Sequence, residues 1–186
     1  TDPDLLLKTR FCDPVQITQH NAQNGGIWCD FTPGEPRPLR MGIYPGHPPD
    51  QPARKRPQLS EPAARIERPG FREGDWHHLA IAWKNFDTDD ADGRATLYVD
   101  GHAAGALVGW NFHMDWDLAA ARIYFAVNYI GLLDELAIFD RELTAGEVRQ
   151  LYLYPGLLNQ EQTPRSARTG NETLDSIAAR VNLLLK

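Results

Sequence analysis

Residues 131–148 read Gly-Leu-Leu-Asp-Glu-Leu-Ala-Ile-Phe-Asp-Arg-Glu-Leu-Thr-Ala-Gly-Glu-Val, and two structural signals follow one another in this stretch. The first part, residues 131–139, is dense in leucine, isoleucine and phenylalanine and predicts a strand. In the second part a hydroxyl residue, Thr144, is followed three positions later by Glu147, which is the spacing of a capping box. The sequence therefore predicts a strand followed by the start of a helix.

The helix is well bounded at both ends. Val148, Leu151 and Tyr152 fall on one helical face, and Pro155-Gly156 stops the pattern. We therefore expect a helix from about Thr144 to Tyr152, packed outside the rest of the domain through this face.

Outside this helix, short strands alternate with turns through much of the chain. The alternation of aromatic or β-branched residues with polar ones predicts strands at residues 4–10, 26–31, 39–44, 76–83, 94–100, 102–108, 121–127 and 131–139. Asp100-Gly101 is a tight-turn dipeptide that joins two of them into a hairpin. Many short strands with one firm helix indicate an all-β sandwich or barrel. Trp28, Trp76 and Trp83 lie in predicted strands, and we expect them in the core.

Three segments of the sequence divide the chain. Residues 45–70 are rich in proline and in basic residues, so we expect a surface loop between strands. This loop is either a solvated excursion or a basic contact arm for an acidic glycan or partner. Residues 157–170 are polar and read as a linker. Residues 171–186 carry an apolar helical stripe, so the predicted organisation is a domain at 1–156, the linker, and a C-terminal amphipathic helix.

Three motifs together resemble the laminin-G-like jelly-roll family, which includes concanavalin-A-like and pentraxin-like modules. They are Gly74-Asp-Trp-His-His-Leu-Ala80, Leu97-Tyr-Val-Asp-Gly101 and the stretch at 131–148, in the family's order and spacing. The match covers roughly residues 70–152. The resemblance implies an antiparallel two-sheet jelly-roll sandwich that recognises carbohydrate or protein outside the cytoplasm. Family members usually carry one or two strands before the one that residues 5–10 match.

Composition and charge exclude several classes of partner. The chain has 186 residues, a formal net charge of −6 and a sequence pI near 5.5, which argues against a general nucleic-acid binder. No apolar run approaches the roughly 20 residues that span a bilayer. The chain begins with Thr1, so we expect a processed form or a fragment, and no signal is present to set the compartment. Cys12 and Cys29 allow either one disulfide or two free thiols.

Residue patterns typical of catalysis are missing. Glycosidases of the sandwich fold resemble one another in an E-x-D-x-(x)-E strand motif, which this sequence lacks. Asp134 and Glu135 are adjacent and point to opposite faces of a strand. No serine has a G-x-S-x-G context, and His77 and His78 diverge on a strand, one inward and the other exposed. We therefore expect a protein that is not an enzyme.

Calcium is the ionic ligand that the sequence favours, as a structural ion. Asp87 and Asp89 lie in an acidic run, residues 87–93, which superficially resembles a calcium loop but has a spacing wrong by one. Its alternative is an acidic loop in water. Asp134 is the second candidate, because the equivalent aspartate of similar jelly rolls often helps to hold calcium; its alternative role is a hydrogen bond that fixes strand register.

The aromatic run at residues 110–116 is the candidate for sugar binding. Trp110 and Trp116 offer rings that stack on a pyranose, and Asn111 and His113 offer polar groups at the rim. The alternative is that the rings plug the end of the sandwich. The first functional hypothesis is therefore a lectin-like binding module of a larger extracellular or periplasmic protein. The second is a structural interaction module that holds a partner chain through residues 171–186, and the third is a polysaccharide-cleaving enzyme.

Overall fold

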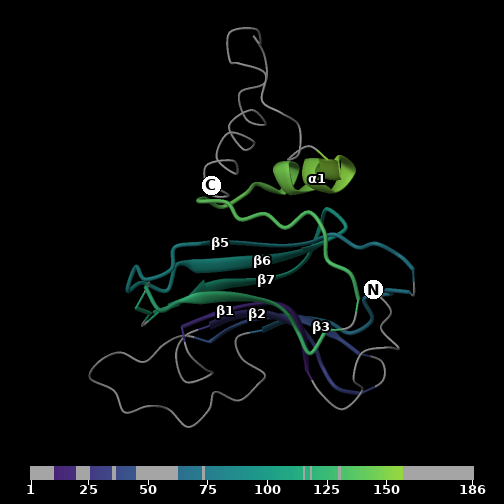
Figure 1. The fold of residues 1–186 in the computed structure, drawn as a ribbon. Helices are drawn as coiled ribbons and strands as arrows, with labels where there is room; N and C mark the ends of the chain where they lie inside the picture. Colours follow the sequence, from purple (N-terminus) through teal and green to yellow (C-terminus); the bar gives the residue numbers. More distant parts are fainter. Residues whose placement is uncertain are drawn as a thin grey trace, which may run out of the picture.

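Two antiparallel β-sheets face one another in the computed structural model, which describes residues 11–19, 26–34, 37–44, 63–72, 74–114, 116–117, 119–129 and 131–156 (Figure 1). The elements are β1 (Cys12–Thr18), β2 (Gly26–Phe31), β3 (Leu39–Tyr44), β4 (Ala63–Ile66), β5 (Leu79–Lys84), β6 (Gly93–Val99), β7 (His102–Trp110), β8 (Arg122–Val127) and α1 (Ala145–Leu153). A five-stranded sheet has the order β4-β3-β2-β1-β8, and a three-stranded sheet has the order β5-β6-β7. The predicted all-β jelly-roll sandwich is confirmed.

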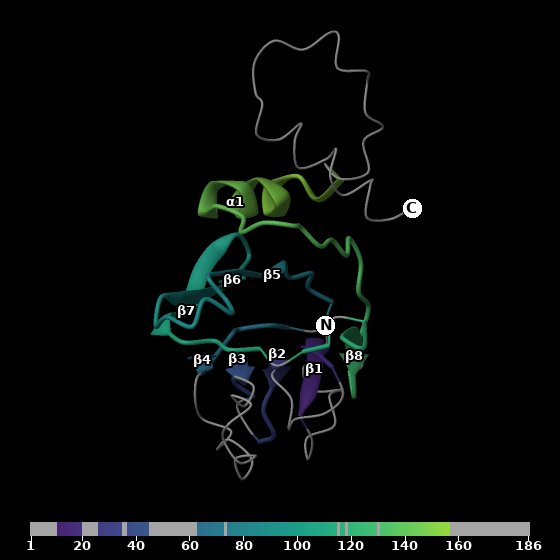
Figure 2. The ribbon, with the colours of Figure 1, turned by 90° about the vertical axis from the view of Figure 1, so that its left-hand side faces the viewer.

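The core lies between the sheets because alternate residues of each strand point inward. From the larger sheet, Ile27, Cys29 and Phe31 of β2 are buried beside their partners on β3. From the smaller sheet, Leu97 and Leu107 close the core from the other side. Figure 2 shows the two layers end on, with β4 below β7 at one flank.

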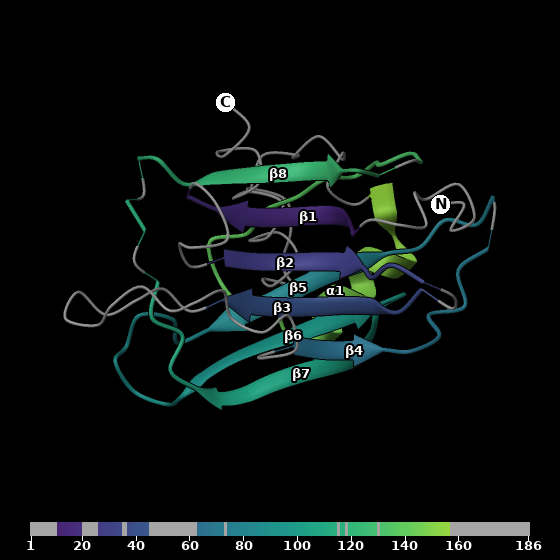
Figure 3. The same ribbon diagram turned by 90° about the horizontal axis from the view of Figure 1, so that it is seen from below.

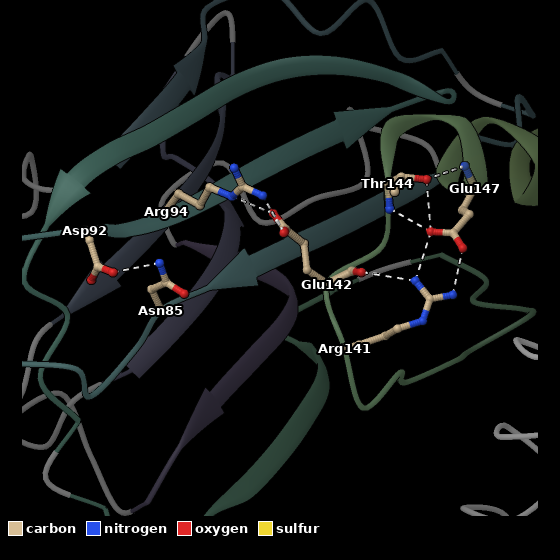
Figure 4. Close-up of polar contacts among 7 residues, drawn as sticks. All are labelled: Asn85, Asp92, Arg94, Arg141, Glu142, Thr144 and Glu147. Atoms are coloured by element: carbon tan, nitrogen blue, oxygen red, sulfur yellow. Dashed lines mark hydrogen bonds and ion pairs between the residues drawn. The ribbon is translucent and has the colours of Figure 1, made fainter. Parts of the chain in front are cut away.

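Helix α1 covers the outer face of the three-stranded sheet, as predicted. Thr144 Oγ1 accepts from Glu147 N at 3.3 Å, and Glu147 Oε2 accepts from Thr144 N at 2.8 Å, so the capping box forms (Figure 4). Arg141 donates two hydrogen bonds to the same carboxylate and lowers the pKa of Glu147 to about 2. Val148 and Leu151 are buried against the sheet, whereas Tyr152 is exposed rather than sharing their buried face.

Two strands occur where the sequence analysis expected none. β1 was missed because it contains Pro14, which cannot donate to a ladder. The structure tolerates this proline because the β1–β2 pairing is irregular between Cys12 and Val15. β4 lies inside the predicted loop 45–70, in a proline-free stretch, and pairs with β3. The rest of that loop lies mostly outside the described residues.

The predicted strand at 131–139 is not formed in the described structure. These residues belong to no ladder, and Glu135 has a φ of 52°, which interrupts an extended backbone. The predicted strand at 76–83 is shifted, because β5 begins at Leu79. The consequence is a smaller sheet that lacks its predicted closing strand.

The outer face of the five-stranded sheet carries a compact cluster of buried side chains. The Trp28 ring lies over Gly42 and stacks on Tyr44, with centroids 3.9 Å apart. Next to it, Asp30 accepts two hydrogen bonds from Arg40, at 2.6 and 2.8 Å. Figure 3 views the molecule from this side, with β1, β2 and β3 in front.

The three strand tryptophans have different environments. Trp28 is 5% exposed and confirms its prediction, although it lies on the outer face. Trp83 packs against the core, as expected. Trp76 is 63% exposed, so its prediction as a core residue is wrong. The reason is that it precedes the first paired residue of β5, where no sheet partner covers it.

Both cysteines are free thiols, which decides between the two alternatives left open above. Cys12 and Cys29 are buried in the core, on neighbouring strands. Burial raises the pKa of Cys12 to about 12 and also raises the pKa of Cys29. Because the thiolate is the reactive species, these side chains act as core residues rather than as nucleophiles.

The predicted strand at 4–10, the linker at 157–170 and the helix at 171–186 lie outside the described residues. Within the described ranges, no helix combines the length and apolar character that crossing a membrane requires.

Candidate functional site

Two separate sequence candidates come together at one end of the three-stranded sheet. Asp87 N donates to Phe112 O at 3.1 Å, and Met114 N donates to Asp87 Oδ1. Asn111 Nδ2 donates to Asp89 O at 3.1 Å. The acidic loop between β5 and β6 and the segment after β7 therefore form one structure. We call residues 85–92 and 110–114 the rim.

The aromatic residues near the rim divide into an exposed ring and buried ones. Phe112 is 1% exposed and packs against Phe86 in the core, so it plugs the sandwich end. Trp116 is partly buried against the same core. Trp110 is 38% exposed and lies nearly parallel to Phe112, with centroids 6.4 Å apart. Of the predicted pair of stacking tryptophans, Trp110 is thus the one presented on the rim.

The polar groups of the rim are held by the local backbone. Asn85, Asp87 and Asp89 have φ near 60°, a region that asparagine and aspartate tolerate better than most residues. The Asn85 amide donates to Asp92 Oδ2 at 2.7 Å, which ties the two ends of the loop (Figure 4). His113 Nδ1 lies 3.5 Å from Asp87 Oδ1 and 3.9 Å from Asp89 Oδ1. The rim therefore combines carboxylates, a histidine and amides with the exposed ring of Trp110.

Metal-ligating side chains are sparse in the described structure. Across those residues, no three histidine, cysteine, aspartate or glutamate side chains gather as a metal-binding group. Asp134 is exposed, and its Oδ1 accepts from Glu135 N at 2.8 Å. Calcium takes six to eight oxygen ligands. The structure does not bring Asp134 together with Asp87 and Asp89, so at either predicted place backbone carbonyls or water would have to supply most of such a shell.

The His77–His78 pair lies at the opposite end of β5 from the rim. His77 Nδ1 lies 2.9 Å from Asp100 Oδ2, and His78 N donates to Asp100 Oδ1 at 2.9 Å. The His77 ring also stacks on Phe71 at 3.8 Å. Both histidines are partly buried, so the prediction that one of them is exposed is wrong. The shared Asp100 carboxylate holds both, which fixes the start of β5 to the turn after β6.

A second acidic cluster escaped the sequence analysis. Burial raises the pKa of Asp13 to about 7, with a further contribution from Asp30, which is itself bonded to Arg40. The predicted strands 26–31 and 39–44 already held the signal. Paired end to end, they place Asp30 opposite Arg40, as the structure does. Asp30 and Arg40 are buried, whereas Asp13 is partly buried.

A protein-family model described as the concanavalin A-like lectin/glucanases superfamily matches residues 55–149, which include β4 to β8 and most of α1. The chain belongs to this superfamily. The strand pairing of the sandwich and the three sequence motifs agree with the match.

Comparison with other proteins adds little to the superfamily assignment. Among solved structures, the chain is similar to an S-layer domain-containing protein (residues 221–444) from Clostridium thermocellum, with 16% identity and a TM-score of 0.35. That similarity covers 74% of this chain and 60% of the other, so this chain spans less than two thirds of its length. No curated protein matches the chain.

Proposed function

We propose that this superfamily member is a non-catalytic binding module that takes a carbohydrate at the rim, as part of a larger extracellular or periplasmic protein. The observation that carries the proposal is an exposed ring, Trp110, on the same rim as Asn111, His113 and the loop aspartates. An exposed ring stacks on the apolar face of a pyranose, and the neighbouring polar groups bond its hydroxyls.

The rim suits binding better than hydrolysis. Cleavage of a glycoside needs one carboxyl group as acid and a second as base or nucleophile, on either side of the bond. On the rim, Asp87 Oδ1 is already engaged by the backbone of Met114 and faces His113. This arrangement supports a carboxylate that positions a ligand. A single aromatic site is weak, so affinity would come from several domains of the host protein acting together.

Replacing Trp110 by alanine should weaken glycan binding about tenfold, through loss of stacking and of buried area. Binding is measured on a glycan array and then by calorimetry with the best glycan, alongside the melting temperature. Trp76→Ala is the matched control, because Trp76 is also exposed but lies at the other end of β5. Loss of binding with unchanged stability in the Trp110 variant supports the rim.

The structural interaction module is the second candidate. Three exposed apolar side chains in one short segment favour it, Leu132, Leu136 and Ile138, because exposed apolar surface is typical of contact sites. Equal glycan binding by the Trp110→Ala and Trp76→Ala variants and the parent, or no glycan binding by any of them, would favour this alternative over the lectin-like module.

We also propose that calcium stabilises the domain, with Asp134 as one ligand. A chelator should then lower the melting temperature by several degrees, because an ion that binds the folded state adds to its stability. Asp134→Ala should abolish this sensitivity to chelator, and Asp87→Ala/Asp89→Ala should leave it unchanged. The reverse result would place the ion at the rim. An unchanged melting temperature in chelator, for the parent protein, would rule out a stabilising calcium at either place.

A further inference from the structure

Exposed apolar side chains gather in β8 and in the segment that follows it. Seven large ones lie between positions 123 and 138, with exposed fractions from 38% to 73%. They are Ile123, Tyr124, Phe125, Leu132, Leu133, Leu136 and Ile138. At about 150–250 Å² per large side chain, these fractions amount to roughly 500–800 Å² of surface. The largest apolar patch of a typical monomer is about 300–600 Å², so this surface is large enough for a protein contact.

One flank of the sandwich carries these side chains. β8 is the last strand of the five-stranded sheet, and it pairs with β1 on one side. The chain then rises from β8 along the same flank toward α1, so residues 131–138 stand beside the edge strand (Figure 2). We call β8 and residues 131–138 the β8 flank. No strand of the described ranges pairs with the outer edge of β8.

β8 lacks the charged residues and prolines that commonly prevent an edge strand from pairing with another chain. It has one charged residue, Arg122 at its start, and no proline. Ile123 and Phe125 share the inner face of the sheet with Ile17 and Val15 of β1, yet both remain partly exposed. The extended backbone is interrupted at Ala126, where φ is 58°. The first four residues of β8 therefore form an apolar edge that another strand can join.

We propose that a second copy of this chain pairs with the edge of β8, so that the two five-stranded sheets join across a two-fold axis. An axis perpendicular to the sheet makes the two strands antiparallel and keeps both inner faces on the same side. Directly opposite residues then share a face, so one residue of β8 must lie opposite its own copy. Tyr124 is that residue, because this register pairs the largest part of the extended strand.

The β8 flank is complementary to itself in this register. Ile123 lies opposite Phe125 of the second copy, which is an aromatic and β-branched pair of the kind that stabilises a sheet. A stable interface buries about 800 Å² on each partner, which the apolar side chains of the flank and their polar margin can supply.

The charges at the two ends of the flank are also complementary. Arg122 begins β8 and donates to the carbonyl oxygens of Ala119 and Ala121. Asp134 is exposed and lies in the segment that follows the other end of the strand. Because the paired strands are antiparallel, Arg122 of each copy approaches the end of β8 from which the Asp134 segment of the other copy rises. Opposite charges then face one another, which favours a second copy as the partner.

Analytical ultracentrifugation of the full chain over a range of concentrations tests the proposal. The sedimenting species should have twice the chain mass of 20.9 kDa and should dissociate on dilution. The mass of a single chain at every concentration would overturn the proposal. A series of larger species would also overturn it, because a two-fold axis closes the assembly at two copies.

The variant Tyr124→Lys locates the interface. It sets two ammonium groups opposite each other at the axis, so association should weaken about tenfold or more. Tyr154→Lys is the matched control, because Tyr154 is also an exposed tyrosine but caps the end of α1. Circular dichroism checks that both variants remain folded. An undiminished dimer in Tyr124→Lys, or an equal loss in Tyr154→Lys, would contradict the assignment to β8.

A mixture of Tyr124→Lys with Tyr124→Glu tests the register. Each variant alone should be monomeric at concentrations where the parent is a dimer. The equimolar mixture should recover the dimer, because opposite charges then lie across the axis. Recovery also shows that both variants are folded. A mixture that stays monomeric would refute a two-fold pairing through Tyr124.

Discussion

Replacing Gly42 by alanine is expected to destabilise the domain by about 3 kcal/mol, because the site has no room for a methyl group. A Cβ built on Gly42 overlaps the indole ring of Trp28 at atoms Cζ2, Cη2 and Cε2. Tyr44 stacks on the same indole ring, so the ring cannot move away from residue 42 without losing that stack. Urea denaturation of both proteins gives the change in the free energy of unfolding, with equal slopes as the check on two-state behaviour.

Gly146→Ala is the matched control for this prediction. Gly146 lies in the first turn of α1, and the nearest atom to its Cβ, Thr144 Oγ1, is 3.9 Å away. Alanine favours a helix over glycine by up to about 1 kcal/mol, so this variant should be unchanged or more stable. A loss below about 1 kcal/mol in Gly42→Ala would mean that the ring does not sit over residue 42.

The parts of the fold that the sequence predicted well are those set by local chemistry. The capping box at Thr144 and Glu147 depends on residues three apart, and it forms as expected. The strands at 26–31 and 39–44 were bounded correctly, because turn residues flank them on the connecting side. Two-residue periodicity was enough to place these strands before their partners were known.

The misses arise where tertiary context overrides local pattern. Residues 131–139 have strand composition, but they pair with none of the described strands. Trp76 has the composition of a core residue, yet it lies just outside the first paired residue of β5. Pairing, rather than propensity, decides both cases.

The rim shows the same limit for function. The acidic loop and the aromatic run were each identified as candidates, for calcium and for sugar. The two segments come together only through the β6–β7 register, which sets Gly93 opposite Trp110. Because this register cannot be read from the sequence, nothing there indicates that Asp87 lies near His113. The buried pair of Asp30 and Arg40 is also a contact between paired strands, and it was missed because the predicted strands 26–31 and 39–44 were not set in register.

Replacing Arg40 by methionine is expected to destabilise the domain by about 3–5 kcal/mol at pH 7, because it leaves the Asp30 carboxylate buried without its cation. Asp30 and Arg40 are 3% and 5% exposed, and two hydrogen bonds join them. The Asp30→Leu/Arg40→Met double variant should recover most of the loss, because an apolar pair needs no compensation of charge. Thermal and urea unfolding of the parent and of the two variants measure the loss and its recovery.

The pH dependence of the stability loss distinguishes a buried, unpaired Asp30 carboxylate from a simple loss of packing. Burial raises the pKa of Asp30, and the hydrogen bonds from Arg40 oppose this rise, so removing Arg40 raises the pKa further. An unfolded aspartate titrates near pH 3.9, and above this the folded variant binds more protons than the unfolded chain. The penalty should therefore be small near pH 4 and grow toward pH 7. Arg94→Met, which breaks the half-exposed pair with Glu142, should change stability much less at both values. A penalty equal at pH 4 and pH 7 would show that Arg40 acts through packing on Phe11 rather than through its charge.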